Sequence, residues 1–142
     1  MRITDVLRRK GDSVATITPD QTVRELLELL AVNKVGALVV SAGDGVVDGI
    51  VSERDIVRRL HTDGPAVLDD RVSSIMTTEV HTCIPEDSLE DLMVTMTQRR
   101  FRHVPVLVDG RLGGIVSIGD VVKNRLEELQ SERDQLTAYI TS

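Results

Sequence analysis

The sequence predicts an α+β fold in which one unit, ordered strand, helix, strand, strand, helix, occurs twice with pseudo-twofold symmetry and is followed by a C-terminal helix. Two observations predict it. The chain superposes on itself at an offset of 66 residues, which brings Val14 over Val80, and the offset shrinks to 65 where Gly49 meets Gly114. The apolar residues of the two copies also share one periodicity. Each copy, of about 60 residues, would be marginally stable alone, so we expect the copies to pack against each other.

Each copy opens with a short strand followed by a capped helix. Residues 14–19 (VATITP) correspond to 80–85 (VHTCIP), and both β-branched runs end at proline, as is typical of a strand that leaves a sheet. A hydroxyl three residues before a carboxylate then predicts each helix start, at Thr22 with Glu25 and at Ser88 with Asp91. The apolar positions that follow have the spacing of one buried helical face. They are Val23, Leu26, Leu27 and Leu30 in the first copy, and Leu89, Leu92, Met93 and Met96 in the second.

Two further strands and a second helix complete each copy. An Asp-Gly pair lies between the two strands of each copy and favours a tight turn. The strands are expected at 35–40 and 46–51, and at 101–106 and 111–116. The helices are expected at 53–60 and from Ile118 onward.

These elements divide the chain into a first repeat at 4–64, a linker at 65–73, a second repeat at 74–123 and a C-terminal helix at 124–142. The linker is marked by turn-forming residues and little periodicity. The C-terminal helix carries apolar residues spaced alternately by four and three, with Arg133 interrupting the seam. They are Val122, Leu126, Leu129, Leu136 and Ile140. The seam is too short to predict a coiled coil, so it fits either packing across the module or a dimer contact.

Composition argues against several classes of protein. A net charge of −6, a pI of about 5.0 and the lack of a long basic cluster argue against a nucleic-acid partner. Nowhere do about 18 apolar residues run together, so we expect neither a signal peptide nor a membrane span. One cysteine, Cys83, fits a reducing compartment, and a cytoplasmic protein is expected.

An enzyme is not expected. The candidate reactive residues are Cys83 and the scattered His61, His81 and His103, and none forms a group with the spacing of metal ligands. No glycine-rich phosphate loop is present. Cys83 falls in an expected strand and is interpreted as a small buried residue.

In its repeat pattern, the chain resembles the tandem CBS-domain pair, and more narrowly the stand-alone bacterial proteins of this type. The likeness covers roughly residues 4–123 and lies in the Thr-containing strand before proline, the strand of the His-Val-Pro-Val type at 103–106, and the Gly-Ile-Val-Ser-x-x-Asp runs that start at Gly49 and Gly114. The resemblance implies a βαββα repeat and clefts that bind an adenine nucleotide, with AMP favoured and ADP, ATP or NAD(H) as the other candidates.

The resemblance also implies ribose contacts from Ser52 and Asp55 and from Ser117 and Asp120. Taken alone, Ser-x-x-Asp is equally a helix cap. The adenine contacts implied are Val14, Thr16, Val35 and Ala37, and Val80, Thr82, Phe101, Val104 and Pro105. Gly36 is also expected at the binding site, as the small and neutral counterpart of Arg102. For phosphate, Arg54, Arg102 and His103 are the preferred cations, whereas Arg99, Arg100 and Lys34 also fit a solvated helix end. We expect two clefts, a cationic one around Arg102 and His103 and a more neutral one.

The chain is therefore expected to be a non-catalytic regulator in which nucleotide shifts the arrangement of repeats or subunits, and a protein effector reads that arrangement. A homodimer is the expected assembly. The alternative is an interaction or scaffold protein whose clefts are structural and whose C-terminal helix mediates association.

Overall fold

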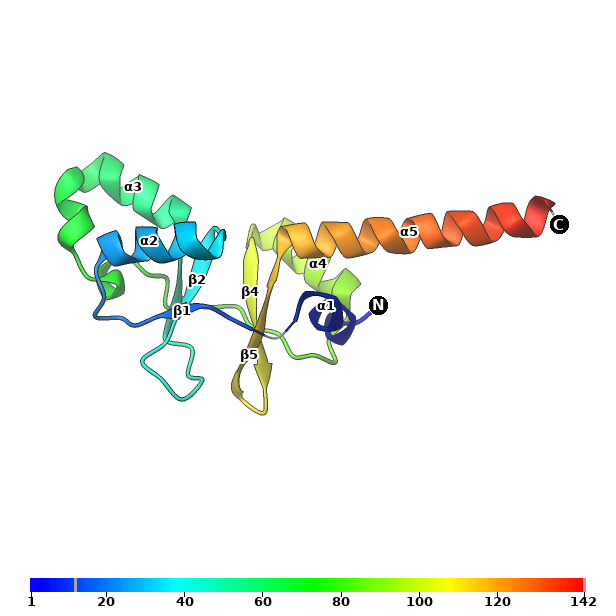
Figure 1. The fold of residues 1–142 in the computed structure, drawn as a ribbon, viewed down its shortest axis with the longest axis horizontal. Coiled ribbons are helices and arrows are strands. Elements are labelled where there is room, and N and C mark those ends of the chain that lie inside the picture. The colour runs from blue at the N-terminus through cyan, green and yellow to red at the C-terminus, as the bar shows by residue number, and fades with distance from the viewer. Residues whose placement is uncertain (12, 142) are drawn as a thin grey trace.

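The computed structural model describes residues 1–11 and 13–141; residues 12 and 142, which fall in the expected first repeat and C-terminal helix, lie outside this description. Its two halves lie side by side, and one long helix extends from the second half (Figure 1). The first half contains β1 (Thr16–Ile17), α2 (Val23–Asn33), β2 (Ala37–Val40), β3 (Gly49–Ser52) and α3 (Glu53–Asp63). The second contains α4 (Leu89–Arg99), β4 (His103–Val108), β5 (Arg111–Ser117) and α5 (Ile118–Thr141). Helix α1 (Ile3–Lys10) and the short 3-10 helices η1 (Pro65–Asp69) and η2 (Val72–Ser74) complete the structure.

The predicted α+β class is confirmed, and the two sheets differ in one detail. In the first half, β1 runs parallel to β2, and β2 is antiparallel to β3. In the second half, β4 and β5 form an antiparallel hairpin. The strand expected at 80–85 forms only a single parallel bridge, Cys83 to Val106, at the position that corresponds to β1.

Local sequence explains where the helices begin and where the chain turns. The hydroxyl of Thr22 accepts a hydrogen bond from the backbone of Glu25 at 3.2 Å, which confirms the predicted cap of α2. The hydroxyl of Ser88 accepts one from Asp91 at 3.3 Å and caps α4. The turn between β4 and β5 has positive φ angles at Asp109 and Gly110, as a two-residue hairpin loop requires.

Each half has its own hydrophobic core, but the chain segments that build the cores are interleaved. The core of the first half includes Val67 and Val72 from the linker, which is structured as η1 and η2. The core of the second half includes Ile3 and Val6 of α1. The core of the first half is therefore completed by the linker that follows α3, and the core of the second half by α1, which precedes β1. Helix α1 was not expected from the sequence.

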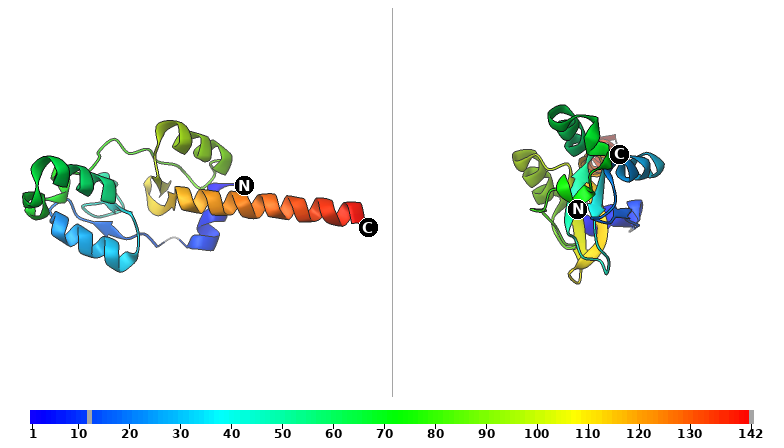
Figure 2. Two further views of the ribbon diagram at one scale, coloured as in Figure 1. Left: turned by 90° about the horizontal axis from the view of Figure 1, so that it is seen from above. Right: turned by 90° about the vertical axis from the view of Figure 1, so that its left-hand side faces the viewer.

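The C-terminal residues form one continuous helix with the second helix of the second repeat. Helix α5 spans 24 residues, and its distal part projects beyond the body of the molecule (Figures 1 and 2). Every described residue from Leu129 to Thr141 is exposed. Among the described residues, no helix is long and apolar enough to cross a membrane.

Candidate functional site

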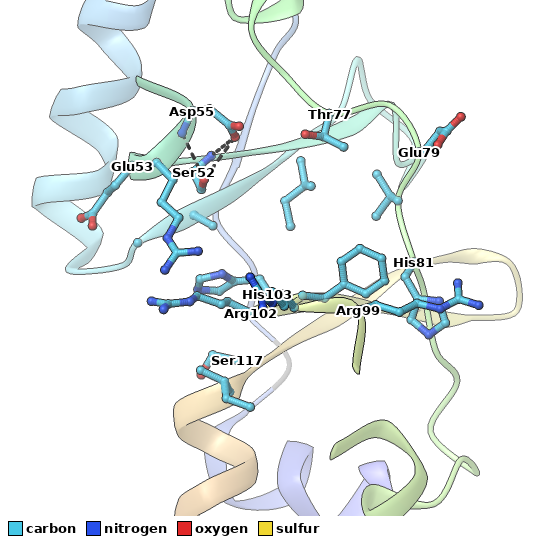
Figure 3. A pocket seen from close by; sticks show the side chains of 18 of the residues that line it. Ser52, Glu53, Asp55, Thr77, Glu79, His81, Arg99, Arg102, His103 and Ser117 are labelled. Atoms are coloured by element: carbon cyan, nitrogen blue, oxygen red, sulfur yellow. Dashed lines mark hydrogen bonds between the residues drawn. The ribbon is translucent and has the colours of Figure 1, made fainter. Parts of the chain in front are cut away.

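A cleft of about 610 Å³ lies between the two halves (Figure 3). Its walls come from the start of α3, the end of α4, the segment that leads into β4, and the chain that crosses from the first half to the second. The lining residues are Gly36, Ala37, Ile50, Ser52, Glu53, Arg54, Asp55, Arg58, Thr77, Glu79, Val80, His81, Arg99, Arg100, Phe101, Arg102, His103, Ser117, Ile118 and Gly119.

Ser52 and Asp55 lie at the start of α3 and hold each other in place. The backbone N–H of Ser52 donates to Asp55 Oδ2 at 2.8 Å, and the hydroxyl of Ser52 donates to the same oxygen at 3.1 Å. The backbone N–H of Asp55 donates in return to Ser52 Oγ at 3.4 Å. The pair is therefore a capping box, as its spacing predicts, and its half-buried carboxylate also faces the cleft.

Five arginines line the same cleft as this carboxylate. Arg54 and Arg58 come from α3, Arg99 ends α4, and Arg100 and Arg102 lead into β4. Within the described part of the chain, none of the five side chains forms a hydrogen bond or an ion pair. Among the other nine arginines, seven form ion pairs within residues 1–11 and 13–141. The cleft thus gathers guanidinium groups that have no anionic partner of their own.

These arginines are unpaired although carboxylates line the same cleft. Glu53, Asp55 and Glu79 line the same cleft. Three carboxylates against five guanidinium groups leave an excess of positive charge, although the whole chain carries −6. A mobile anion would be attracted to this cleft and repelled by the protein as a whole.

Two stacked rings line the cleft, alongside charged residues such as Glu79 and Arg99. The rings of His81 and Phe101 stack with centroids 5.5 Å apart and planes inclined by 15°. Both residues line the cleft together with Val80 and Ile50. A flat aromatic group could contact these rings and aliphatic side chains. They belong to other chain segments than Arg54 and Arg58 of α3.

His103 begins β4 and lies on the wall that faces Ser52 and Asp55 (Figure 3). Burial lowers the pKa of His103, and the charges of Lys10 and Arg102 lower it further, while Asp120 and Glu53 act in the opposite direction. The net shift is downward, so the neutral imidazole is favoured in the unliganded protein. An anion beside His103 would favour its protonated form.

The second Ser-x-x-Asp position has the same local geometry but a different environment. The backbone N–H of Ser117 donates to Asp120 Oδ2 at 2.9 Å, and that of Asp120 donates to Ser117 Oγ at 3.1 Å. Lys10 Nζ lies 2.7 Å from Asp120 Oδ2. Burial alone would raise the pKa of Asp120, but the hydrogen bonds from Lys10 and Ser117 outweigh it and lower the pKa of this carboxyl.

Ten of the residues expected at a binding site line the cleft together with Arg99 and Arg100. They are Gly36, Ala37, Ser52, Arg54, Asp55, Val80, Phe101, Arg102, His103 and Ser117. The others lie outside its lining, namely Val14, Thr16, Val35, Thr82, Val104, Pro105 and Asp120. Val104 is fully buried in the core of the second half. Lys34, the remaining candidate cation, is not among the lining residues either.

The grouping of the site residues differs from the expected one. Arg102 and His103 share one cleft with Ser52 and Asp55, where we expected a cationic and a neutral site apart. Sequence reasoning also missed eight lining residues, namely Ile50, Glu53, Arg58, Thr77, Glu79, His81, Ile118 and Gly119. Arg58 follows Arg54 by four residues on α3, and this spacing, which places both on one helix face, could have indicated it.

Other chemistry is not indicated by the described residues. Cys83 is buried, and burial, with a contribution from the charge of Asp87, raises its pKa to about 12, which keeps the thiol protonated and unreactive. Among residues 1–11 and 13–141, no group of three or more His, Cys, Asp or Glu could hold a metal ion.

The fold and cleft define a tandem-repeat protein whose two α+β units face each other across one polar cavity. The chain belongs to the CBS-domain family, because the model of that family matches residues 3–62 and 72–127. It is 37% identical to the mitochondrial CBS-domain protein CBSX3 of Arabidopsis thaliana over 146 aligned residues, which cover 97% of this chain and 71% of that protein.

Solved structures give the same result. The CBS-domain protein ATU1752 of Agrobacterium tumefaciens is 47% identical, with a TM-score of 0.85 over 88% of this chain and 99% of that one. The CBS pair of protein MJ0100, crystallised with 5-methylthioadenosine and S-adenosyl-L-methionine, has a TM-score of 0.80 over 90% of this chain and 98% of that one. Its identity is 21%, so this likeness concerns the fold alone.

Proposed function

We propose that this chain is a non-catalytic regulatory module that binds an adenine nucleotide in the cleft between its two repeats. One observation carries the proposal: the Asp55 carboxylate, fixed by Ser52, faces a cleft with five unpaired arginines. A carboxylate suits adjacent ribose hydroxyls, and guanidinium groups suit phosphate. An adenosine ligand in a similar fold, the MJ0100 pair, is in keeping with this assignment.

The lining residues support a direction for the ligand. The base would lie toward Val80 and the His81–Phe101 stack, the ribose would contact Asp55, and the phosphates would extend toward Arg54 and Arg102. Stacking on aromatic rings and contacts with aliphatic side chains stabilise a bound purine, and these contacts do not depend on how many phosphates the nucleotide carries. The arginines then determine how many phosphates are preferred.

The excess of guanidinium groups favours ADP or ATP over AMP, the ligand that the resemblance favours. A single phosphate engages one or two arginines in bidentate contacts, whereas a triphosphate offers oxygens to several. Arginines left beside AMP would keep repelling one another. NAD(H) also fits the charge, because its pyrophosphate carries two negative charges that arginines can pair with.

Replacing Arg102 by alanine is expected to weaken ATP binding by about five- to tenfold and AMP binding by less, because exposed charges are screened and contribute about 1 kcal/mol each. Isothermal titration calorimetry with AMP, ADP, ATP and NADH on both proteins measures the difference. Arg133→Ala is the matched control, since this arginine lies on the exposed part of α5. Equal losses for AMP and ATP would contradict the placement of the phosphates, and no binding by the unaltered chain would contradict the proposed function.

Nucleotide binding would act through conformation. The cleft is built from both repeats, so a ligand that contacts α3 on one side and the 99–103 segment on the other changes the free energy of their relative arrangement. A homodimer partner or a protein effector would respond to that arrangement. A cytoplasmic location stays a prediction, and the related plant protein is named as mitochondrial.

A second candidate function, association through α5, is favoured by the exposed distal part of this helix. Leu136 and Ile140 are 62% and 79% exposed, and a helix that projects from a protein is marginal in water without packing. Pairing with the same helix of a second copy would cover these side chains and yield the expected homodimer.

Light scattering coupled to size exclusion is expected to give the mass of a dimer for the unaltered chain and of a monomer for Leu136→Glu combined with Ile140→Glu, because charges at the seam cannot be buried without a partner. Gln135→Glu, also on the exposed part of α5, is the charge control. A monomer before substitution, or a dimer after it, would count against this role. ATP affinity measured on the same samples shows whether association and binding are separate.

A further inference from the structure

The second Ser-x-x-Asp position is engaged by the chain itself. We propose that Lys10 closes this position, so that each chain binds one nucleotide, at Asp55, while Asp120 holds Lys10 and contacts no ribose. This inference rests on the proposed function and goes beyond it, because it assigns different roles to two carboxylates that the repeat makes equivalent.

The two carboxylates differ in two respects that bear on ligand binding, the ion pair with a lysine and the exposure to the cleft. Both accept a hydrogen bond from the backbone of the serine three residues earlier, at 2.8 Å for Asp55 and 2.9 Å for Asp120. Asp55 has no ion-pair partner within the described part of the chain and lines the cleft, whereas Asp120 is paired with Lys10 and does not line it. The difference therefore lies in the paired cation and in the access to the cleft, and not in the backbone hydrogen bond from serine.

Lys10 is held at this position by more than one contact. Its ammonium also donates to the backbone carbonyl of Ile115 at 2.9 Å, so two acceptors from the β5–α5 segment fix it. The side chains of Lys10 and Asp120 are 33% and 24% exposed. This partial burial reduces the screening that weakens ion pairs on open surfaces.

Helix α1 brings Lys10 to Asp120. Ile3 and Val6 anchor the helix in the core of the second half, and they are 0% and 1% exposed. Arg9 forms an ion pair with Glu127 and donates to Asn124 Oδ1 at 3.3 Å, which ties the end of α1 to α5. The ammonium is thus delivered by a docked helix, and withdrawing it would require this docking to loosen or the side chain to change rotamer.

A ribose competes poorly for this carboxylate. A ribose hydroxyl and an ammonium both make charge-assisted hydrogen bonds to a carboxylate, but the hydroxyl is neutral, whereas the ammonium of Lys10 also attracts the carboxylate by its own positive charge. Displacing Lys10 would also leave its ammonium beside the backbone carbonyl of Ile115 alone. A nucleotide in the cleft therefore meets an available carboxylate at Asp55, whereas the carboxylate of Asp120 is held by Lys10 outside the lining.

The residues of the ion pair do not line the cleft, but their charges act on a residue that does. His103 lines the cleft, yet the charges of Lys10 and Asp120 both act on its imidazole. Lys10 is therefore close enough to the cleft to influence it without being one of its lining residues. Removing the ammonium would free Asp120 without removing a group of the Asp55 site.

The test is the number of ATP molecules bound per chain, measured by titration calorimetry and by native mass spectrometry on the full chain. We expect one for the unaltered chain, two for Lys10→Met, and one again for Lys10→Met combined with Asp120→Asn. Methionine keeps the aliphatic stem of lysine and removes its charge. Arg8→Met is the matched control on α1, because Arg8 is 77% exposed and lies 4.0 Å from Asp5.

Each outcome separates the inference from the proposed function. Two ATP molecules on the unaltered chain, or one on a folded Lys10→Met variant, would overturn the inference and leave the Asp55 site intact. Weaker binding of the single ATP by Lys10→Met would overturn it as well, because Lys10 would then be a phosphate contact. No ATP on any variant would overturn both. Thermal unfolding followed by circular dichroism verifies that each variant is folded.

Discussion

Replacing Asp55 by asparagine is expected to weaken nucleotide binding by about 10- to 100-fold, the largest single effect on affinity that the cleft predicts. The carboxylate is half-buried, fixed by two hydrogen bonds from Ser52, and faces the cavity. Hydrogen bonds to a charged group contribute about 1.5–3 kcal/mol, which corresponds to this range of affinity. Asparagine keeps the shape and one acceptor, so the change isolates the charge. Titration calorimetry with ATP measures the loss.

Two other aspartates provide controls because the repeat places them in similar caps. Asp91 accompanies Ser88 at the start of α4, where no ligand is proposed, so Asp91→Asn reports the effect of weakening a helix cap. Asp120→Asn tests the equivalent position at α5. It should leave the ATP affinity within about twofold of the unaltered value, which corresponds to a change in binding free energy of roughly 0.4 kcal/mol. If Asp55→Asn bound ATP as well as Asp91→Asn does, Ser52 and Asp55 would be a cap and nothing more.

Local patterns predicted much of the fold because they depend on neighbouring residues. The starts of α2 and α4 follow from a hydroxyl and a carboxylate three residues apart, and the β4–β5 turn follows from Asp109 and Gly110. The strand expected at 80–85 shows the limit of such patterns. Its β-branched residues favour an extended chain, but only Cys83 finds a bridge partner, because a strand also needs a neighbour along its length.

The candidate site was predicted less well because it depends on contacts between the halves. The repeat shows that Ser52 corresponds to Ser117, and that the segment around Gly36 corresponds to the one around Arg102. It does not show which residues of one repeat contact which residues of the other. The structure brings Ser52 and Asp55 of the first half together with Arg102 of the second. One cleft therefore collects a carboxylate and cations that sequence alone divided between two.

The Lys10–Asp120 ion pair could not be predicted from the sequence because the two residues are 110 positions apart. The available signal was the pattern of Ile3, Val6 and Leu7, whose spacing of three and four is that of a short apolar helix face. That pattern predicts a helix but not the surface on which it docks. The docking depends on the core of the second half, which forms only when the chain is folded.

Replacing Ile3 by alanine is expected to destabilise the protein by about 2–5 kcal/mol, because a fully buried side chain is removed from a packed core. The melting temperature should fall by on the order of 10 °C. The effect would be large for a residue so close to the N-terminus, since terminal segments that are not docked contribute little. Urea unfolding and thermal unfolding, both followed by circular dichroism, measure it.

The matched control is Val32→Ala on α2, where the side chain is 71% exposed and a change within about 0.5 kcal/mol is expected. A similarly small effect of Ile3→Ala would contradict the docking of α1, and with it the position of Lys10. A large effect would mean that the second half requires a helix that precedes β1 of the first half. In that case the stability of the core and the closure of the second carboxylate depend on one short helix, because Ile3 anchors it and Lys10 ends it.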